Sequence, residues 1–312
     1  MNTIIRKTAG CFALINRIGA LTNALFAVRA QKINYAALIT LATTLFCAPL
    51  VQAADYSYSV SQGFEFSSGK YGTDTRTDTI FAPFTVMASP TDRLGLSLEI
   101  PLVYQSNGNV VSSLGRGGMQ ASNSTMLSSA KVSGMSGSGS GMSSSSASTN
   151  QSEGGLGDIT LRLGYVLVPE KESIPQIRPM VFVKFPTADK NKSLGTGEFD
   201  EGLAVEVSKW FGNWNPFAEA GYTIQGRSAQ LALKNYVTYN AGAGYQVTER
   251  FRPILLLKGA SPPADGTSSL LEVRLKLDYQ ATNHTGIEAY ISKGVTTNSP
   301  DYGTGLAVFF DF

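Results

Sequence analysis

The stretch LLEVRLKLDY, residues 270–279, alternates between apolar and charged side chains. From Leu271 to Tyr279, apolar or aromatic residues take the odd-numbered positions and charged residues take the even-numbered ones. Successive side chains of a β-strand point to opposite faces, whereas a helix with 3.6 residues per turn would spread the charges around its axis. The stretch is therefore predicted to be a strand with one apolar face and one charged face.

The same alternation recurs along the chain, for example in LGLSLEIPLVY (94–104) and GDITLRLGYVLVP (157–169). Each alternating stretch is close to the roughly 9–11 residues that a tilted strand needs to cross a bilayer. Twelve strands are predicted, with 10 or 14 as open alternatives. They lie near residues 56–66, 77–88, 94–105, 157–168, 177–186, 201–211, 216–226, 235–247, 252–259, 270–280, 286–293 and 302–312.

The connections between these strands alternate in length. Short ones near residues 89–93, 169–176, 212–215, 248–250 and 281–285 are interleaved with longer ones. Short turns at one rim and long loops at the other are the plan of an outer-membrane barrel, with the short turns on the periplasmic side. We therefore predict an all-β fold, an antiparallel transmembrane β-barrel of about 12 strands, in the outer membrane of a Gram-negative bacterium.

The composition agrees with a membrane barrel. The 312 residues are 43% hydrophobic and only 15% charged, whereas soluble domains carry about a quarter charged residues. After residue 53 the chain has no run of the roughly 20 apolar residues that a membrane helix needs. The same part of the chain holds 20 basic and 23 acidic residues, which gives no reason to expect a nucleic-acid partner.

The N-terminal segment has the pattern of an export signal. Arg29 and Lys32 precede the apolar run AALITLATTLFCAPL, and the chain then continues through small residues to Ala53. Charge, a short apolar core and small residues are the order found in a signal peptide. We expect residues 1–53 to be a leader cleaved after Ala53, and residues 54–312 to form the barrel. The translation start within this leader stays open.

Charged side chains occupy the inward positions of most predicted strands. One interpretation is a pore lining that sets the preference for ions or solutes. The other is a salt-bridged plug that fills a narrow barrel, because small barrels are filled by side chains and large ones leave a channel. Besides Glu65, the pore-lining candidates are Glu99, Arg162, Arg178, Lys184, Glu206, Glu219, Arg252, Lys258, Glu272, Arg274, Lys276 and Glu288.

One long connection is a low-complexity segment. Residues 107–155 are dense in serine and glycine, and such a composition buries too little apolar surface to offset chain entropy. We predict a disordered extracellular loop. Its four methionines are Met119, Met126, Met135 and Met142. A copper(I) site is one interpretation of these thioethers, and apolar contacts with the barrel mouth are the favoured one.

Residues for catalysis or metal binding are scarce. The single histidine, His284, lies in a predicted periplasmic turn, so neither a histidine-cluster metal site nor a Ser-His hydrolase is expected. Glu198, Asp200 and Glu201 share an outer loop and could hold Ca²⁺, although a solvated loop is favoured. We predict a protein that is not an enzyme and has no cofactor and no metal.

The last predicted strand ends in aromatic residues on its outward face. In YGTGLAVFFDF (302–312), Phe310 and Phe312 share a face with Leu306 and Val308. Such an ending resembles the signal that the bacterial barrel-assembly machinery reads. The predicted partners are this machinery, outer-membrane lipid and lipopolysaccharide, and a small-molecule solute. Aromatic residues near many other strand ends are predicted to form girdles at the bilayer interfaces.

Three motifs resemble the outer-membrane family named for the meta-cleavage pathway of phenol degradation. They are GLGD (155–158), VKFPTADKNKSLGTGEFD (183–200) and AEAGYTIQG (218–226), and the match in order and spacing extends over most of the chain after the leader. The resemblance implies a barrel that passes small, often aromatic or hydrophobic, compounds, and it assigns no functional residue. The expected function is a passive outer-membrane channel. A structural or adhesive surface barrel is the first alternative, and an outer-membrane enzyme is the second.

Overall fold

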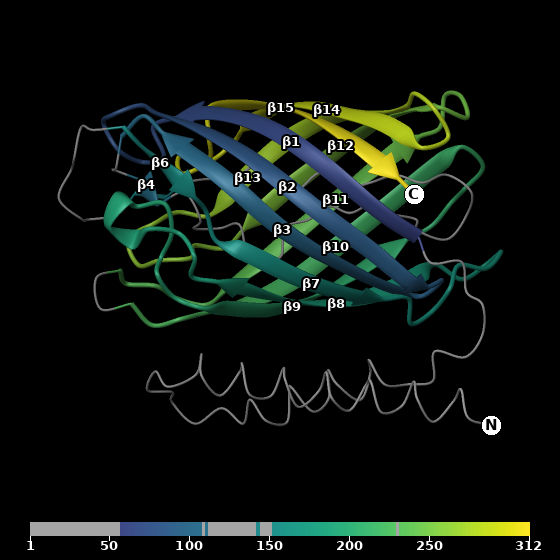
Figure 1. The fold of residues 1–312 in the computed structure, drawn as a ribbon, viewed down its shortest axis with the longest axis horizontal. Helices are drawn as coiled ribbons and strands as arrows, with labels where there is room; N and C mark the ends of the chain where they lie inside the picture. The colour runs from purple at the N-terminus through teal and green to yellow at the C-terminus, as the bar shows by residue number, and fades with distance from the viewer. Residues whose placement is uncertain (1–56, 108–109, 112–141, 144–151, 229–230) are drawn as a thin grey trace, which may run out of the picture. The chain divides into compact units, whose positions relative to one another are not determined.

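The protein forms a closed antiparallel β-barrel of twelve strands (Figure 1). The computed structural model describes residues 57–107, 110–111, 142–143, 152–228 and 231–312, so the predicted leader and most of the low-complexity loop lie outside the described residues. Within the described part, no helix is long and apolar enough to span a membrane. The wall consists of thirteen segments, of which β6 and β7 together make one of the twelve strands. The segments are β1 (Ser57–Gly69), β2 (Thr77–Thr91), β3 (Leu94–Gln105), β6 (Glu153–Leu156), β7 (Ile159–Tyr165), β8 (Gln176–Phe185), β9 (Asp200–Ser208), β10 (Trp214–Gln225), β11 (Tyr236–Tyr245), β12 (Phe251–Ala260), β13 (Leu270–Gln280), β14 (Thr285–Gly294) and β15 (Tyr302–Asp311).

With β6 and β7 taken as one strand, each strand of the wall pairs with its sequence neighbours, and β1 closes the barrel by pairing with β15. The predicted strands are confirmed to within a few residues at their ends. A short 3₁₀ helix, η1 (Lys190–Lys192), follows β8 in the connection to β9. The strands run obliquely across the barrel (Figure 1), as closure of a sheet into a barrel requires.

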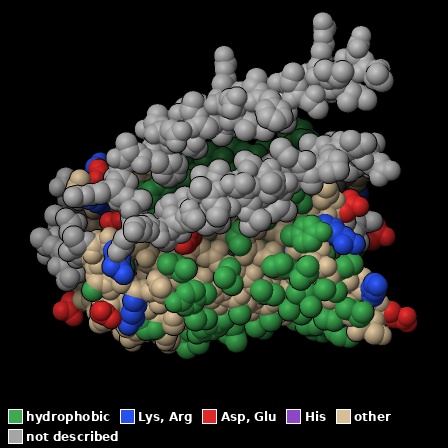
Figure 2. Space-filling model, turned by 90° about the horizontal axis from the view of Figure 1, so that it is seen from below, with side chains coloured by type: hydrophobic (Ala, Val, Ile, Leu, Met, Phe, Trp, Pro, Cys, Tyr) green, Lys and Arg blue, Asp and Glu red, His purple; other side chains and the backbone are tan. Residues whose placement is uncertain are grey.

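The two faces of the wall differ in chemistry as the alternation predicts. On β13, Leu275 is 42% exposed on the outer face, whereas its neighbour Lys276 is buried inside. Figure 2 shows that hydrophobic side chains cover the middle of the outer wall, while charged side chains gather at its two ends. This is the surface of a transmembrane barrel, in which an apolar band faces lipid.

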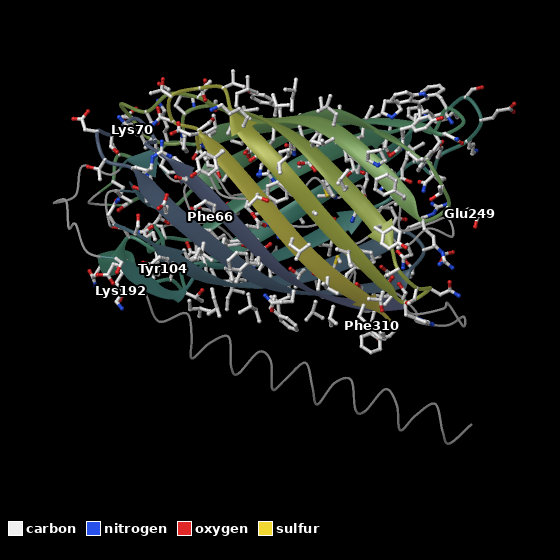
Figure 3. The ribbon with its side chains drawn as sticks, turned by 90° about the horizontal axis from the view of Figure 1, so that it is seen from above. Phe66, Lys70, Tyr104, Lys192, Glu249 and Phe310 are labelled. Atoms are coloured by element: carbon white, nitrogen blue, oxygen red, sulfur yellow. The ribbon has the colours of Figure 1, made fainter. Side chains whose placement is uncertain are left out.

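The two ends of the barrel carry different connections. Lys70 and Lys192 lie at one end with the long connections, and Glu249 lies at the other end with the short turns (Figure 3). The short turns include residues 92–93 between β2 and β3 and residues 281–284 between β13 and β14. The segregation of connection lengths that the sequence predicts is therefore present.

The strand that opens with the GLGD motif is split in two, and this corrects the sequence prediction. β6 and β7 both pair with β3, and the chain breaks its ladder at Gly157 and Asp158. A Cβ on Gly157 would lie 2.8 Å from Val103 Cγ2, so the break needs glycine. β6 also begins at Glu153, inside the loop predicted for residues 107–155.

A second pair of short strands lies within the same predicted loop. β4 (Val110–Val111) pairs with β5 (Met142–Ser143). The loop is therefore not free of regular structure along its whole length. The other three methionines that the sequence analysis considers for copper lie outside the described residues.

Two prolines interrupt the ladder in the middle of the wall. Pro83 on β2 lies opposite Pro101 on β3, and neither residue has a backbone N–H to donate. The outward-facing Gln62 of β1 donates from Nε2 to the backbone oxygens of Gly63, at 2.9 Å, and Pro83, at 3.2 Å. A polar side chain on the lipid face thus satisfies carbonyls beside the interruption, which a bilayer core without water requires.

Aromatic side chains lie near strand ends on the outer surface, as the girdle prediction expects. Tyr58, Tyr104, Trp214 and Tyr279 are each more than 40% exposed. Trp210 departs from the prediction, because its ring lies 5.9 Å from the guanidinium of the buried Arg252. Tyr56 lies outside the described residues.

Candidate pore lining

The charged residues selected from the sequence all lie buried on the inner face. Alternation within each strand places them there, and register between strands decides which of them meet. Each is at most 9% exposed, a set that comprises Glu65, Glu99, Arg162, Arg178, Lys184, Glu206, Glu219, Arg252, Lys258, Glu272, Arg274, Lys276 and Glu288.

The first charged group joins β12, β13, β14 and β1. Glu272 accepts a hydrogen bond from Arg274 Nη2 at 2.7 Å and lies 4.0 Å from Lys258 Nζ. The Arg274 guanidinium also lies 4.4 Å from the ring centre of Tyr290. The Tyr290 hydroxyl donates to Glu65 at 3.0 Å. A single chain of contacts therefore crosses the lumen wall from β12 to β1.

The same group continues toward the short-turn end. Lys276 Nζ lies 2.9 Å from Glu288 and 3.5 Å from Asp278. Arg252 contacts the other oxygen of Asp278 at 3.1 Å. Asp278 was not among the selected candidates, although its parity on β13 matches that of Lys276. Every charge in this part of the wall has an opposite charge close by, as burial requires.

The second charged group lies on the wall from β3 to β11. Arg162 Nη1 lies 3.6 Å from Glu99. Arg178 is opposite Glu206 in the register of β8 with β9, and Glu206 is in turn opposite Glu219 of β10. This part of the wall therefore contains two arginine side chains and three carboxyl groups. This differs from the first group, where the charges balance.

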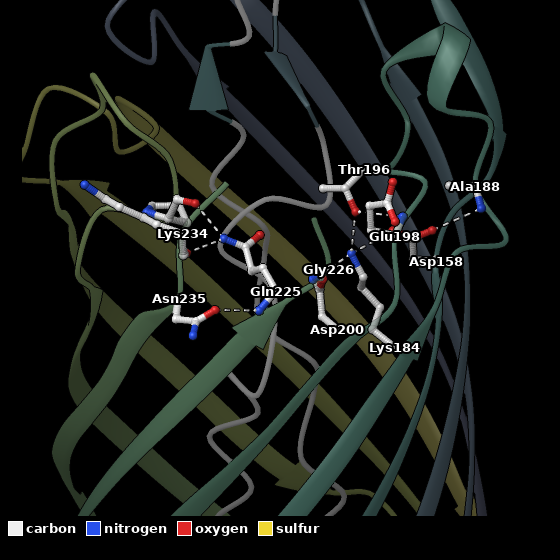
Figure 4. Close-up of polar contacts among 11 residues, drawn as sticks. Asp158, Lys184, Ala188, Thr196, Glu198, Asp200, Gln225, Gly226, Lys234 and Asn235 are labelled. Carbon is white, nitrogen blue, oxygen red and sulfur yellow. Dashed lines mark hydrogen bonds and ion pairs between the residues drawn. The ribbon is translucent and has the colours of Figure 1, made fainter. Parts of the chain in front are cut away.

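A third cluster lies at the end with the long connections (Figure 4). Lys184 Nζ lies 2.7 Å from Asp200 and 3.1 Å from Asp158, and it donates to Thr196 Oγ1 at 3.1 Å. The lysine and both aspartates are buried. Asp158 and Asp200 were not selected as lumen residues, because both lie where a predicted strand begins or a loop ends.

The two aspartates also bind backbone from neighbouring connections. Asp158 Oδ1 accepts the N–H of Ala188 at 3.0 Å, and Asp200 Oδ1 accepts the N–H of Gly226 at 3.2 Å. All three motifs quoted from the sequence therefore meet at Lys184. In this fold, the three motifs hold their connections around one buried ammonium group, that of Lys184.

The connection between β8 and β9, residues 186–199, folds inward over the lumen. Ala188 and Leu194 pack against the inward-facing Phe81 of β2 and Val103 of β3. On the same side, Gln105 Nε2 donates to the backbone oxygen of Lys192 at 3.2 Å. Because these partners lie on the inner face, the connection narrows the barrel at this end.

The acidic loop considered for Ca²⁺ does not gather its carboxyl groups. Asp200 binds Lys184, as described above, while Glu201 lies opposite Val183 on the outward parity of β9. Burial raises the pKa of the Glu198 carboxyl above its usual range, and the Lys190 ammonium partly opposes that shift. Among the described residues, no group of three or more His, Cys, Asp or Glu side chains could hold a metal ion.

The remaining predicted site residues lie at the other end, on the outside. Phe310 and Phe312 are 41% and 64% exposed, and their rings contact each other at 4.9 Å between centres. Phe310 lies at the short-turn end of the barrel (Figure 3). His284 stacks on Phe310 at 6.2 Å, with Nδ1 3.0 Å from the backbone oxygen of Asp311.

Solved structures of outer-membrane barrels resemble this fold. An outer-membrane channel from Pseudomonas putida F1 superposes with a TM-score of 0.60 at 15% identity, covering 84% of this chain and 97% of that one. The NanC porin gives a TM-score of 0.47 at 11% identity over 81% of this chain and 98% of that one. The CymD monoaromatic hydrocarbon channel gives 0.42 at 12% identity over 86% and 92%. The first of these supports the fold alone.

A family model matches most of the barrel. None of the curated proteins matches the chain. The model described as "Putative MetA-pathway of phenol degradation" matches residues 102–312, which is more than half of the sequence and includes the three motifs that meet at Lys184. The chain therefore belongs to this family of outer-membrane barrels.

Proposed function

We propose that the protein is a passive channel of the outer membrane for small solutes. The observation that carries this proposal is the contrast between the two faces of one closed wall. The outer face is apolar over its middle, whereas the inner face carries charged side chains on most of its strands. A barrel that only anchored itself in lipid would not need a charged interior, and charged rings are how channels select what they pass.

The solutes are small, because the lumen is lined by long charged side chains and narrowed by residues 186–199. The family description names phenol degradation, so aromatic compounds are the first solutes to test. No described group of residues supplies a metal site, and several of the inner charges, such as Arg274 with Glu272 and Lys276 with Glu288, are held in ion pairs. We infer a role in passage without catalysis.

The route to the membrane forms part of the same proposal. Residues 1–53 are cleaved after Ala53, so N-terminal sequencing of the mature protein should begin at Ala54. The barrel-assembly machinery then recognises the aromatic end of β15, and lipid and lipopolysaccharide surround the outer wall. A mature protein that begins upstream of residue 40 would contradict the leader.

The test is conductance of the purified barrel in planar bilayers. Folding is checked first by heat-modifiable migration on a gel, and heat-denatured protein is the control. We expect discrete channel openings, with the current reduced when phenol is added. A folded barrel that passes neither current nor solute into liposomes would contradict the channel and favour a structural surface barrel, in which the ion pairs act as a plug.

A further inference from the structure

We propose that Glu219 of β10, together with Asn240 of β11, is a cation-recognition site in the lumen and gives the channel a preference for small monovalent cations over anions. This inference rests on the proposed channel function. Both residues lie on the inner face in mid-strand and are at most 3% exposed. They are directly opposite each other in the register of the two strands.

The carboxyl group of Glu219 has no ion pair with any described residue. Its Oε1 accepts a hydrogen bond from Asn240 Nδ2 at 3.0 Å, which is a neutral donor. Its Oε2 is buried without a hydrogen-bond donor, and so is Oδ1 of Asn240. Two oxygen acceptors on neighbouring strands therefore have no donor in the described structure.

The neighbouring charged side chains lie beside other charged groups as well. In the register of the sheet, Glu206 of β9 lies directly opposite Glu219, and Arg178 of β8 lies opposite Glu206. Arg162 pairs with Glu99. Of the three carboxyl groups on this wall, that of Glu219 has no cation of its own, whereas Glu272, Asp278 and Glu288 on β13 and β14 each have one.

The described interior as a whole also has more buried carboxyl groups than buried cations. The buried charged side chains of the barrel comprise seven cations and ten carboxyl groups. Low-dielectric walls concentrate the field of such an excess, which raises the local concentration of the opposite charge. The cations are Arg162, Arg178, Lys184, Arg252, Lys258, Arg274 and Lys276, and the carboxyl groups are those of Glu65, Glu99, Asp158, Asp200, Glu206, Glu219, Glu272, Asp278, Glu288 and Asp311.

The chemistry of the two acceptors identifies the class of ligand. Carboxylate and amide oxygens are hard ligands that suit small hard cations. Two oxygens with one negative charge do not make a closed divalent site, which takes six or more oxygen ligands. A partly hydrated alkali cation that binds and leaves is the ligand that fits, and weak binding of this kind is what conduction requires.

The test is the reversal potential of the complete barrel in a planar bilayer under a KCl gradient. For the wild type, we expect the sign of a K⁺ preference. Glu219→Gln, which keeps the shape and the hydrogen bond to Asn240, should shift the reversal potential toward zero. Glu219→Asp, which keeps the charge, should retain more of the preference than the glutamine variant. Glu249→Gln removes a carboxyl from an exposed periplasmic turn and should leave the preference unchanged.

The outcomes separate the two proposals. Channels with an anion preference, or an equal shift in Glu219→Gln and Glu249→Gln, would overturn the cation site and leave the channel function intact. An unchanged reversal potential in Glu219→Gln would also overturn it, because a proton on Glu219 would already neutralise the group. If Glu219→Gln fails to fold, Asn240→Asp is the second variant, and its added carboxyl should increase the K⁺ preference. A folded wild-type barrel without current would overturn the channel function, and the preference with it.

Discussion

Adjacent residues on the outer and inner faces of β13 have different physical requirements. Leu275 faces outward beside another apolar side chain, Ile291 of β14. It needs no specific partner, because lipid is an apolar solvent. Lys276 faces inward and depends on two carboxyl groups, those of Glu288 and Asp278. Alternation alone would make Lys276 a freely replaceable lumen position. The ion pairs show instead that the inner face tolerates fewer substitutions than the outer face, because a buried charge such as that of Lys276 depends on particular partners.

The largest expected effect is on the inner face, at Lys184. Lys184→Met leaves Asp158 and Asp200 buried without their shared cation, and breaking a buried pair in this way costs about 3–5 kcal/mol. We expect a lower free energy of unfolding in urea, and a higher conductance because residues 186–199 lose their attachment.

The matched control for this change lies in the same connection. Lys192 pairs with Glu153 at 3.7 Å, but its side chain is 46% exposed. Lys192→Met should therefore cost no more than about 1 kcal/mol, as exposed pairs do. Equal losses in the two variants would show that the buried cluster does not hold the connection.

The second effect is on the outer face. Leu275→Arg places a charge at mid-strand against lipid, which costs about 2–4 kcal/mol near the bilayer midplane and much less at the interface. The matched variant is Ile287→Arg, near the short-turn end of β14, which should cost about 1 kcal/mol or less. Unfolding in liposomes measures both. If Ile287→Arg were the more damaging, the assigned depth of the wall would be wrong.

The third effect tests an exception to the rule for the outer face. Gln62→Leu replaces a polar side chain by an apolar one on the lipid side, and a transfer argument predicts stabilisation. We expect the opposite, a loss of about 1–3 kcal/mol, because the carbonyls of Gly63 and Pro83 lose their donor. Val308→Leu, at the residue opposite Gln62 on β15, is the control and should be nearly neutral. A more stable Gln62→Leu barrel would show that these carbonyls need no partner.

The facing of a side chain can be predicted from the sequence, whereas its partners cannot. A period of two is a local property, so the facing of Lys276 or Glu219 follows from its own strand. Partners follow from register and from connections far apart in the sequence, so the meeting of Asp158, Lys184 and Asp200 could not be predicted from the pattern. The split between β6 and β7 could not be predicted for the same reason. Gly157 lies close to β3 only when both segments are paired with that strand. The sequence does contain one indication of ion pairs: acidic and basic residues alternate two positions apart on the inward face of β13.

The smallest effect on stability is expected at the last strand, where the outer face has a proposed role in assembly. Phe312 is 64% exposed, and its main described ring contact is with Phe310. Phe312→Ala therefore removes little buried surface, and refolding in detergent should proceed as in the wild type. In cells, the variant should reach the outer membrane at a lower level, because the machinery that inserts barrels would lose the aromatic side chain it recognises. Phe211→Ala is the matched control, since Phe211 is 62% exposed in the turn between β9 and β10. Membrane levels and refolding yields, measured side by side, separate assembly from stability. A fall in membrane level that is equal in both variants would mean that any exposed aromatic of this rim serves, and that the end of β15 has no special part.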